Sequence, residues 1–415
     1  MRKRICILLA VILLMLSMAA CAKPTSSQVP TTVLPSGPVA DLGDTQGWTM
    51  AKRQEGAFSD EGYYHVKSAS FLMFTDLKTA TTVCLCSKPG CLHWEGDLHT
   101  METCEANIAY YAGPMFFVSD NLYYFTSDAY GTQLLRRDAA GFAEETVCTV
   151  GQMYTKDEKS VQIDHMLYTD GYIYYDAIVS APVWDSETGV SEIKDINYYI
   201  GRIDLKNGKD EVLLEKDTQT NMRICAVRSG GLLYFTAQLP ELDYEDPGYS
   251  EAFLNQNYVL NYWDLEKDQT TVVLQKPLRE CQDIMQVHGE KIYFKEHGLV
   301  GNATYAYDMK SGIETLVAQN TLRHLGGGYA LEKQDGEWEV LNMHTGQRFP
   351  FALSEITTVV SFSDKFCILR QSKNLEDGSQ KREQSIVSYA DLADGLQEAD
   401  LLTFDTVINM PQTGP

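Results

Sequence analysis

A turn followed by an alternating strand recurs seven times along this chain, and this repeat is the feature that most limits its fold. Each turn offers Asp, Asn or Gly where a positive φ is needed, and period-2 apolar residues follow it. The instances are SDEGYYHVKS from Ser59, SDNLYYFTSD from Ser119, TDGYIYYDAI from Thr169, SGGLLYFTAQ from Ser229, HGEKIYFKEH from His288, GGGYALEK from Gly326 and SDKFCILRQS from Ser363.

A second element follows each of these hairpins, with the form apolar-x-apolar-x-Asp, a short turn and another apolar strand. The turn acids are Asp76, Asp138, Asp204, Asp264, Asp308 and Asp391, and the sixth unit has Asn342 instead. Acids of this kind bind the backbone N–H groups of their own turn. Because they recur in almost every unit, no single one of them is expected to be catalytic.

One more apolar strand precedes each hairpin, so a unit has four strands and spans about 37 to 60 residues. That length and strand number are typical of a β-propeller blade. We therefore predict an all-β fold, a β-propeller with seven four-stranded blades. The sixth unit is degenerate and the first lacks a clear innermost strand, which leaves six and eight blades as alternatives.

The N-terminus predicts export and lipid attachment. MRKR is followed by the apolar run ICILLAVILLML and then by Met18-Ala19-Ala20-Cys21, which resembles a bacterial lipobox except at Met18. We predict a lipoprotein signal peptide over residues 1–20, a lipidated Cys21 within a Pro/Ser/Thr-rich linker over residues 21–46, and the propeller over residues 47–410. The protein is thus expected at the extracytoplasmic face of the cell membrane. The alternative is an ordinary secretory signal.

Charge excludes one class of partner. The net charge is −23, from 57 acidic and 34 basic residues, and the chain has no basic stripe, which argues against nucleic acid. On an exported protein this charge favours solubility over a dedicated acidic recognition surface.

The stretch CLCSKPGCLHWEGDLHTMETC, from Cys84 to Cys104, holds the densest group of metal-ligating residues. Leu92 separates Cys91 from His93, so the stretch lacks the motif for covalent haem attachment. Zinc binding, a disulfide and free thiols stay open, since Cys86, Cys91, His93 and Cys104 form a Cys3His set while an extracytoplasmic location favours oxidation. In each case the role is structural. The other cysteines, on strands, are expected to act as small apolar residues.

Three insertions are predicted between the second and third strands of their blades, at residues 180–196, 238–257 and 372–383. In a propeller these connections project from the same face as the connections from one blade to the next, which include the cysteine stretch. Function on a repeat scaffold is usually found on such unequal loops. The predicted binding residues are Trp184, Asp185, Asp243, Tyr244, Glu245, Asp246 and Tyr249. Solvated acids and aromatic anchors are the simpler interpretation, and the acids lack the spacing of a calcium loop.

The chain also resembles a known family, the TolB-like β-propeller lipoproteins of low-GC Gram-positive bacteria. The resemblance covers residues 58–404, and its most specific part is the motif L-C-x-K-P-x-C-x-H followed by Cys-x-Ala. The matching residues are Leu85, Cys86, Lys88, Pro89, Cys91, His93, Cys104 and Ala106. The resemblance implies the fold and the location, and it implies no chemistry.

The sequence contains no catalytic motif of the nucleophile-elbow, zinc-protease or phosphate-loop kind, so no catalytic residue is predicted. We predict a lipid-anchored binding module for a protein, a peptide or a glycan. The alternative is a propeller glycan hydrolase or lyase, and a further alternative is a metal-binding surface protein that uses the Cys3His loop. The sequence establishes no cofactor, and zinc is the candidate that suits the Cys3His set.

Replacing the lipidation residue tests the anchor. In the Cys21→Ser variant the acyl attachment is lost, so the protein should move from the membrane fraction to the soluble extracytoplasmic fraction. Fractionation and intact-mass measurement of the mature protein would show the change. A Cys21→Ser variant that stays with the membrane would favour an anchor other than lipid.

Overall fold

The computed structural model describes most of the predicted propeller. The chain divides into two units, Met1–Pro35 and Ser36–Pro415. The described residues are 49–50, 56–67, 71–91, 93, 103–108, 111–128, 131–139, 143–155, 159–185, 190–216, 220–242, 245–320, 322–334, 337–351, 358–363, 365–375, 379–392, 395–397 and 401–409. The predicted signal peptide and Cys21 lie outside them.

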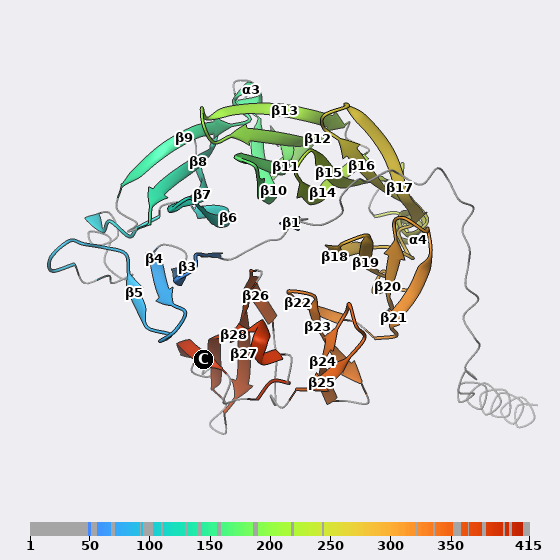
Figure 1. Ribbon diagram of the computed structural model, residues 1–415. Helices are drawn as coiled ribbons and strands as arrows, with labels where there is room; N and C mark the ends of the chain where they lie inside the picture. The colour runs from blue at the N-terminus through green and yellow to red at the C-terminus, as the bar shows by residue number, and fades with distance from the viewer. Residues whose placement is uncertain are drawn as a thin grey trace, which may run out of the picture. The chain divides into compact units, whose positions relative to one another are not determined.

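The fold is a seven-bladed β-propeller with four-stranded antiparallel blades, as predicted (Figure 1). The strands of each blade follow one another in the chain. Blade 1 has β2 (Gly56–Phe58), β3 (Gly62–Lys67), β4 (Phe71–Asp76) and β5 (Thr82–Cys84). Blade 2 has β6 (Tyr111–Val118), β7 (Asn121–Asp128), β8 (Gly131–Asp138) and β9 (Glu144–Val150), and α3 (Gln152–Thr155) follows it. Blade 3 has β10 (Ser160–Thr169), β11 (Tyr172–Asp185), β12 (Val190–Asp204) and β13 (Lys209–Lys216).

The remaining blades repeat this order. Blade 4 has β14 (Thr220–Arg228), β15 (Gly231–Gln238), β16 (Asn257–Asp264) and β17 (Gln269–Pro277), with α4 (Tyr249–Leu254) before β16. Blade 5 has β18 (Asp283–His288), β19 (Lys291–Lys295), β20 (Thr304–Asp308) and β21 (Glu314–Ala318). Blade 6 has β22 (Leu322–Gly326), β23 (Tyr329–Gln334), β24 (Glu337–Asn342) and β25 (Arg348–Pro350). Blade 7 has β26 (Thr358–Phe362), β27 (Phe366–Asn374), β28 (Gln380–Ser388) and β29 (Leu402–Asn409), with α5 (Tyr389–Leu392) before β29.

A short additional strand lies on the inner edge of blade 4. β1 (Thr49–Met50) pairs antiparallel with β14, and Thr49 lies opposite Val227. The segment that precedes blade 1 in the sequence therefore pairs with blade 4. The repeat pattern does not predict this arrangement.

The turns between the first two strands of each blade occur where the repeat predicts them. Asp170 and Gly171 have φ values of 50° and 83° between β10 and β11, which is the left-handed region that the Asp-Gly pair was expected to supply. Blades 1 and 7 use serine instead: Ser59 Oγ accepts the Gly62 N–H at 3.0 Å, and Ser363 Oγ accepts the Phe366 N–H at 3.0 Å.

Four of the predicted turn acids between the third and fourth strands bind their own backbone, as predicted: Asp76, Asp204, Asp264 and Asp308. Asp76 Oδ1 accepts the N–H of Thr79 at 2.8 Å, and Asp308 Oδ1 accepts the N–H of Ser311 at the same distance. Asn342 Oδ1 fills the same role towards Thr345 at 3.1 Å. The prediction is wrong for Asp391, which lies in helix α5, because the connection to β29 is longer in blade 7 than in the other blades.

The hydrophobic core lies between neighbouring blades, and tyrosine fills much of it. Tyr63, Tyr124, Tyr175, Tyr199, Tyr258 and Tyr293 are all nearly inaccessible to solvent. The strand cysteines Cys225, Cys281 and Cys367 are buried in the same layers, and Cys84 and Cys148 are half-buried. These residues act as the small apolar side chains that the sequence predicts.

The ring closes through side chains of blades 7 and 1. Tyr63 packs in one cluster with Val360 and Ile368. Ser361 Oγ donates to the Gly56 carbonyl oxygen at 3.3 Å, and the Lys365 ammonium lies 3.1 Å from the Asp60 carboxylate. Apart from β1, which joins the sheet of blade 4, each of the seven sheets is built from consecutive strands in the part of the chain that the structure describes. No described strand is shared between blades 7 and 1, so closure depends on packing rather than on a shared sheet.

His65 makes this closure sensitive to acid. Its ring lies 5.4 Å from the ring of Phe404 in blade 7, and its Nε2 is 3.0 Å from Thr75 Oγ1. Burial, together with the smaller effect of the Lys67 charge, lowers the pKa of His65 from 6.5 to about 4. The imidazole is therefore neutral in the folded protein at neutral pH.

We expect the free energy of unfolding to fall as the pH drops from 6.5 to about 4. In this range His65 is protonated in the unfolded chain but stays neutral in the folded protein, so protonation stabilises the unfolded state. This shift corresponds to roughly 3 kcal/mol at its full extent. Urea unfolding across this pH range should show a shallower loss for His65→Gln than for the unchanged protein. His297→Gln, outside this seam, is the control, and an equal slope in all three proteins would contradict the assignment.

Candidate functional site

The cysteine connection, residues 85–110, joins β5 of blade 1 to β6 of blade 2. Both of its described ends pair with the start of β4: Leu85 N–H donates to the Leu72 carbonyl oxygen at 3.0 Å, and Leu72 N–H donates to that of Ala106 at 2.8 Å. Cys104 and Ala106 are buried with Phe71 and Leu72. The connection therefore has its own contact with the core.

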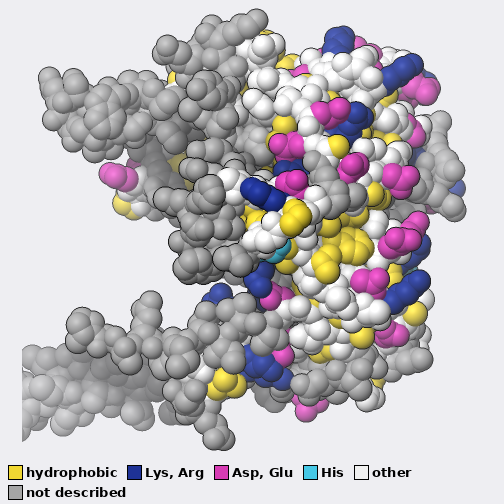
Figure 2. Space-filling view, turned by 90° about the vertical axis from the view of Figure 1, so that its left-hand side faces the viewer, with side chains coloured by type: hydrophobic (Ala, Val, Ile, Leu, Met, Phe, Trp, Pro, Cys, Tyr) yellow, Lys and Arg dark blue, Asp and Glu magenta, His cyan; other side chains and the backbone are white. Residues whose placement is uncertain are grey.

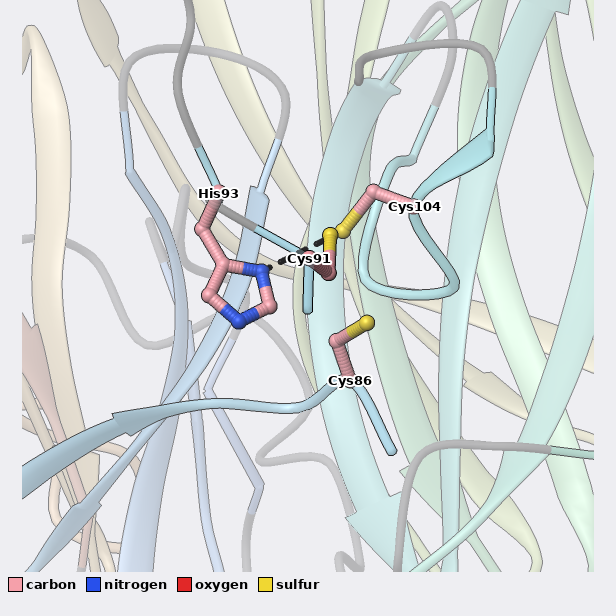
Figure 3. Close-up of side chains that lie close together, drawn as sticks. All are labelled: Cys86, Cys91, His93 and Cys104. Atoms are coloured by element: carbon pink, nitrogen blue, oxygen red, sulfur yellow. Dashed lines mark hydrogen bonds between the residues drawn. The ribbon is translucent and has the colours of Figure 1, made fainter. Parts of the chain in front are cut away.

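The structure brings together the four residues that the sequence singled out. The ligand atoms of Cys86, Cys91, His93 and Cys104 all lie within 4.8 Å of one another, and we call this set the thiol–histidine cluster (Figure 3). Cys104 Sγ is 3.6 Å from His93 Nδ1. The three cysteines are free thiols, and Cys104 is buried.

Backbone turns and side-chain hydrogen bonds hold the two halves of the cluster together. Cys91 N–H donates to the Lys88 carbonyl oxygen at 3.3 Å, which folds the chain back at Pro89-Gly90 as the sequence predicts. Ser87 donates to Glu105 Oε2 from its backbone nitrogen at 2.9 Å and from its hydroxyl at 2.8 Å. Lys88 Nζ donates to the Thr103 carbonyl oxygen at 3.2 Å.

Cys86 differs electrostatically from its neighbours. Burial opposes ionisation of its thiol, but the N–H groups of Lys88 and Glu105 and the thiols of Cys104 and Cys91 outweigh burial and lower its pKa. Burial raises the pKa of Cys84 to about 11 and is also the main cause that raises that of Cys104 to about 12. Two backbone donors are thus directed at the sulfur of Cys86, and one, from Ala106, at that of Cys104.

Arg137 ties the cysteine connection to blade 2. Its side chain is 5% exposed, and it donates to the carbonyl oxygens of Glu105 at 2.6 Å and Asn107 at 3.3 Å. The same guanidinium binds the Glu144 carboxylate at 2.7 Å and the Tyr124 hydroxyl at 2.7 Å. Sequence reasoning missed this residue, because neighbouring Arg136 and Arg137 cannot be told apart without knowing which side of β8 is buried.

The loop face is our name for the side of the propeller that carries the connections between second and third strands and between blades. In blade 3 the insertion continues β11 and β12 as a ladder to the pair Asp185–Val190. In blade 4 it contains α4. Figure 2 shows acidic and basic side chains interspersed over the described part of one side of the molecule, which agrees with a general solubilising charge.

The predicted loop-face residues have different surroundings. Trp184 and Asp185 end β11, and their side chains lie outside the described set, as do Asp243 and Tyr244 altogether. Glu245 is exposed.

Two other loop-face predictions involve residues held within the loop. Asp246 Oδ1 accepts the Gly248 N–H at 2.7 Å. Tyr249 is half-buried and stacks on Phe253, with ring centroids 6.2 Å apart, and Phe253 packs against the core. The prediction that aromatic residues anchor this loop is confirmed for Phe253.

Sequence reasoning missed a cavity of about 220 Å³ at the loop face. Its walls come from three successive blades: His165, Arg223, Ile224, Cys225, Phe235, Tyr258, Gln282, Asp283 and Ile284. Tyr258 is the second residue of β16, at the end of the blade 4 insertion. Gln282 ends the connection between blades 4 and 5, and Asp283 is the first residue of β18. The cavity therefore opens where the loop-face connections enter the blades.

A buried carboxylate supports one wall of this cavity. Asp176 accepts the backbone N–H of His165 at 2.9 Å and that of Ile224 at 2.8 Å, so it joins blade 3 to blade 4. Burial opposes protonation of the His165 ring, but Asp176 and Asp164 outweigh burial and raise its pKa. The signal in the sequence was an aspartate within the apolar strand IYYDAI.

Comparison with known proteins supports the fold. No protein-family model matches the chain, and no curated protein matches its sequence. Solved structures are similar: a puromycin hydrolase mutant (TM-score 0.52, 11% identity, covering 91% of this chain and 57% of that chain) and an acylaminoacyl peptidase with a chloromethyl ketone (0.51, 10%, 86% and 52%). Another is an acylaminoacyl peptidase from Pyrococcus horikoshii (0.50, 9%, 86% and 52%).

The chain spans a little over half the length of these similar proteins. At such low identity the similarity shows a β-propeller fold like that in peptidase structures and nothing of the activity. The assignment to the lipoprotein family stays a prediction.

Replacing Arg137 should loosen the cysteine connection. Arg137→Met removes the donors to two carbonyl oxygens and the partner of Glu144, and we expect a cost of about 2–4 kcal/mol in the free energy of unfolding. The control is Arg136→Met, whose ion pair with Glu145 is exposed and should contribute less than about 1 kcal/mol. Urea unfolding would compare the two variants, and equal midpoints would contradict this role for Arg137.

Proposed function

We propose that this protein is a lipid-anchored, extracytoplasmic binding module that takes a protein, a peptide or a glycan on its loop face. The predicted signal peptide and Cys21 support the location. Within the described residues, no helix is long and apolar enough to cross a bilayer.

The observation that carries the binding proposal is the cavity between blades 3, 4 and 5. Its walls offer a cation in Arg223, a carboxylate in Asp283, an amide in Gln282 and the rings of Phe235 and Tyr258. A volume of about 220 Å³ is smaller than a typical site for a whole ligand, so it fits one side chain or one sugar unit. The rest of the ligand would lie on the adjacent blade 4 insertion.

The chemistry of the cavity favours binding over hydrolysis. Both oxygens of Asp176 accept backbone N–H groups, one in blade 3 and one in blade 4. Because both of its oxygens already accept hydrogen bonds, this carboxylate holds the cavity wall in place and is poorly placed to act as a general acid or base. The side chains that line the cavity are donors, acceptors and rings, which suit recognition.

Binding of the soluble body to envelope preparations tests the proposal. We expect saturable binding of residues 47–415 that Arg223→Ala weakens at least tenfold and Tyr249→Ala also weakens, since one residue lines the cavity and the other lies on the adjacent insertion. Lys267→Ala is the matched control, because it removes one exposed cation from a turn on the opposite face. Treating the envelopes with a protease or with glycan-degrading enzymes separates a polypeptide ligand from a glycan.

Two results would contradict the loop-face assignment. The first is binding that neither loop-face variant weakens. The second is binding that Lys267→Ala weakens as much as Arg223→Ala does.

A further inference from the structure

The thiol–histidine cluster has the ligand number and the spacing of a tetrahedral metal site. With Zn–S bonds of about 2.3 Å and Zn–N bonds of about 2.0–2.1 Å, a tetrahedron places sulfur and nitrogen about 3.6 Å apart and two sulfurs about 3.8 Å apart. The observed separation of Cys104 Sγ from His93 Nδ1 is 3.6 Å, and all four ligand atoms lie within 4.8 Å of one another. The side chains converge from both ends of the connection (Figure 3).

The backbone is arranged to hold these ligands. His93 has a φ of 51°, a left-handed conformation that few non-glycine residues adopt, and it directs the ring towards Cys104. The hydrogen bonds from Ser87 to Glu105 and from Lys88 to Thr103 connect the two halves of the cluster, which are separated in sequence. Such second contacts orient ligands in metal sites.

Backbone N–H groups lie close to two sulfurs of the cluster. Backbone N–H groups of Lys88 and Glu105 are directed at Cys86, and that of Ala106 is directed at Cys104. The buried cysteine Cys367, in contrast, is surrounded by apolar side chains of the core.

We propose that the thiol–histidine cluster binds one structural zinc ion. Soft thiolates with one imidazole in a tetrahedral arrangement favour zinc over hard cations such as calcium and magnesium. The four protein ligands complete the coordination shell, so no position is left for a substrate or for a water molecule to be activated. Binding releases the protons of the three thiols to solvent.

The arrangement favours zinc over a disulfide. A disulfide would use two of the three thiols and leave the third beside an imidazole without a partner. Zinc uses all four groups and links residues 86–93 to Cys104, which itself lies in the core of blades 1 and 2. The ion would therefore fix the cysteine connection on the loop face, whatever ligand that face binds.

Metal analysis of the purified full chain tests the proposal. We expect about one zinc per chain and near-complete loss in Cys86→Ser, Cys91→Ser and Cys104→Ser. Cys84→Ser is the matched control, since Cys84 is two residues from Cys86 but outside the cluster, and it should keep the zinc. His93→Cys should also keep it, because a fourth thiolate replaces the imidazole, whereas His93→Ala should lose it.

A spectroscopic measurement on the unchanged protein tests the site even if the cysteine variants fail to fold. Cobalt(II) added to the metal-free, reduced protein should give the visible absorption of tetrahedral cobalt and a thiolate charge-transfer band, and zinc should abolish both. Removal of zinc by a chelator should lower the melting temperature of the unchanged protein and of Cys84→Ser.

Three results would overturn the zinc assignment. One is a zinc-free protein whose mass is lower by two hydrogens for each disulfide. Another is reduced protein that fails to take up Zn²⁺. The third is zinc that remains in all three serine variants of the cluster.

Discussion

The contact of blade 7 with blade 1 determines whether the other blades form a ring. Tyr63 from blade 1 packs against Val360 and Ile368 from blade 7, and His65 lies against Phe404 beside them. Among the described strands, each blade is formed by one continuous stretch of chain, so this seam joins the two ends of the repeat by packing. The positions of all loop-face connections depend on this closure, because each blade is held by its two neighbours.

The number and order of the blades could be predicted because the turns are determined locally. Asp76 and Asp308 bind the N–H groups of their own turns, and Asp170-Gly171 supplies left-handed residues, so a few adjacent residues encode each turn. Asp391 shows where this reasoning fails. The local pattern is the same, but a longer connection leads to β29 and the residue lies in α5.

β1 shows a second limit, since Thr49 and Met50 pair through backbone atoms with a strand far along the chain. Two residues have no periodicity from which such pairing could be inferred.

The candidate site also contains some residues that the local sequence predicts and others that depend on distant parts of the chain. The thiol–histidine cluster could be recognised because its four residues lie in one short stretch. Arg137 and the cavity around Arg223 could not, because Arg137 binds carbonyl oxygens of a connection about 30 residues away in sequence and the cavity walls come from three blades. A charge within an apolar strand is the available signal, and it marks a buried polar contact without identifying its partner. Asp176 is such a case, since one of its two backbone partners is in the next blade.

The described parts of the loop face are held by contacts within the propeller, so the proposed ligand would meet connections that are already in place. The cysteine connection is joined to blade 1 through the backbone of Leu72 and to blade 2 through Arg137. The blade 4 insertion is held by Phe253 in the core and by the ion pair of Glu251 with Arg279 at 2.8 Å.

Loops fixed in this way lose little conformational entropy on binding, so more of the contact energy contributes to affinity. A small cavity such as the one beside Arg223 could then hold a single side chain or sugar unit of the proposed ligand. The contacts that hold the described parts of the connections and the small cavity thus support the same proposed binding role.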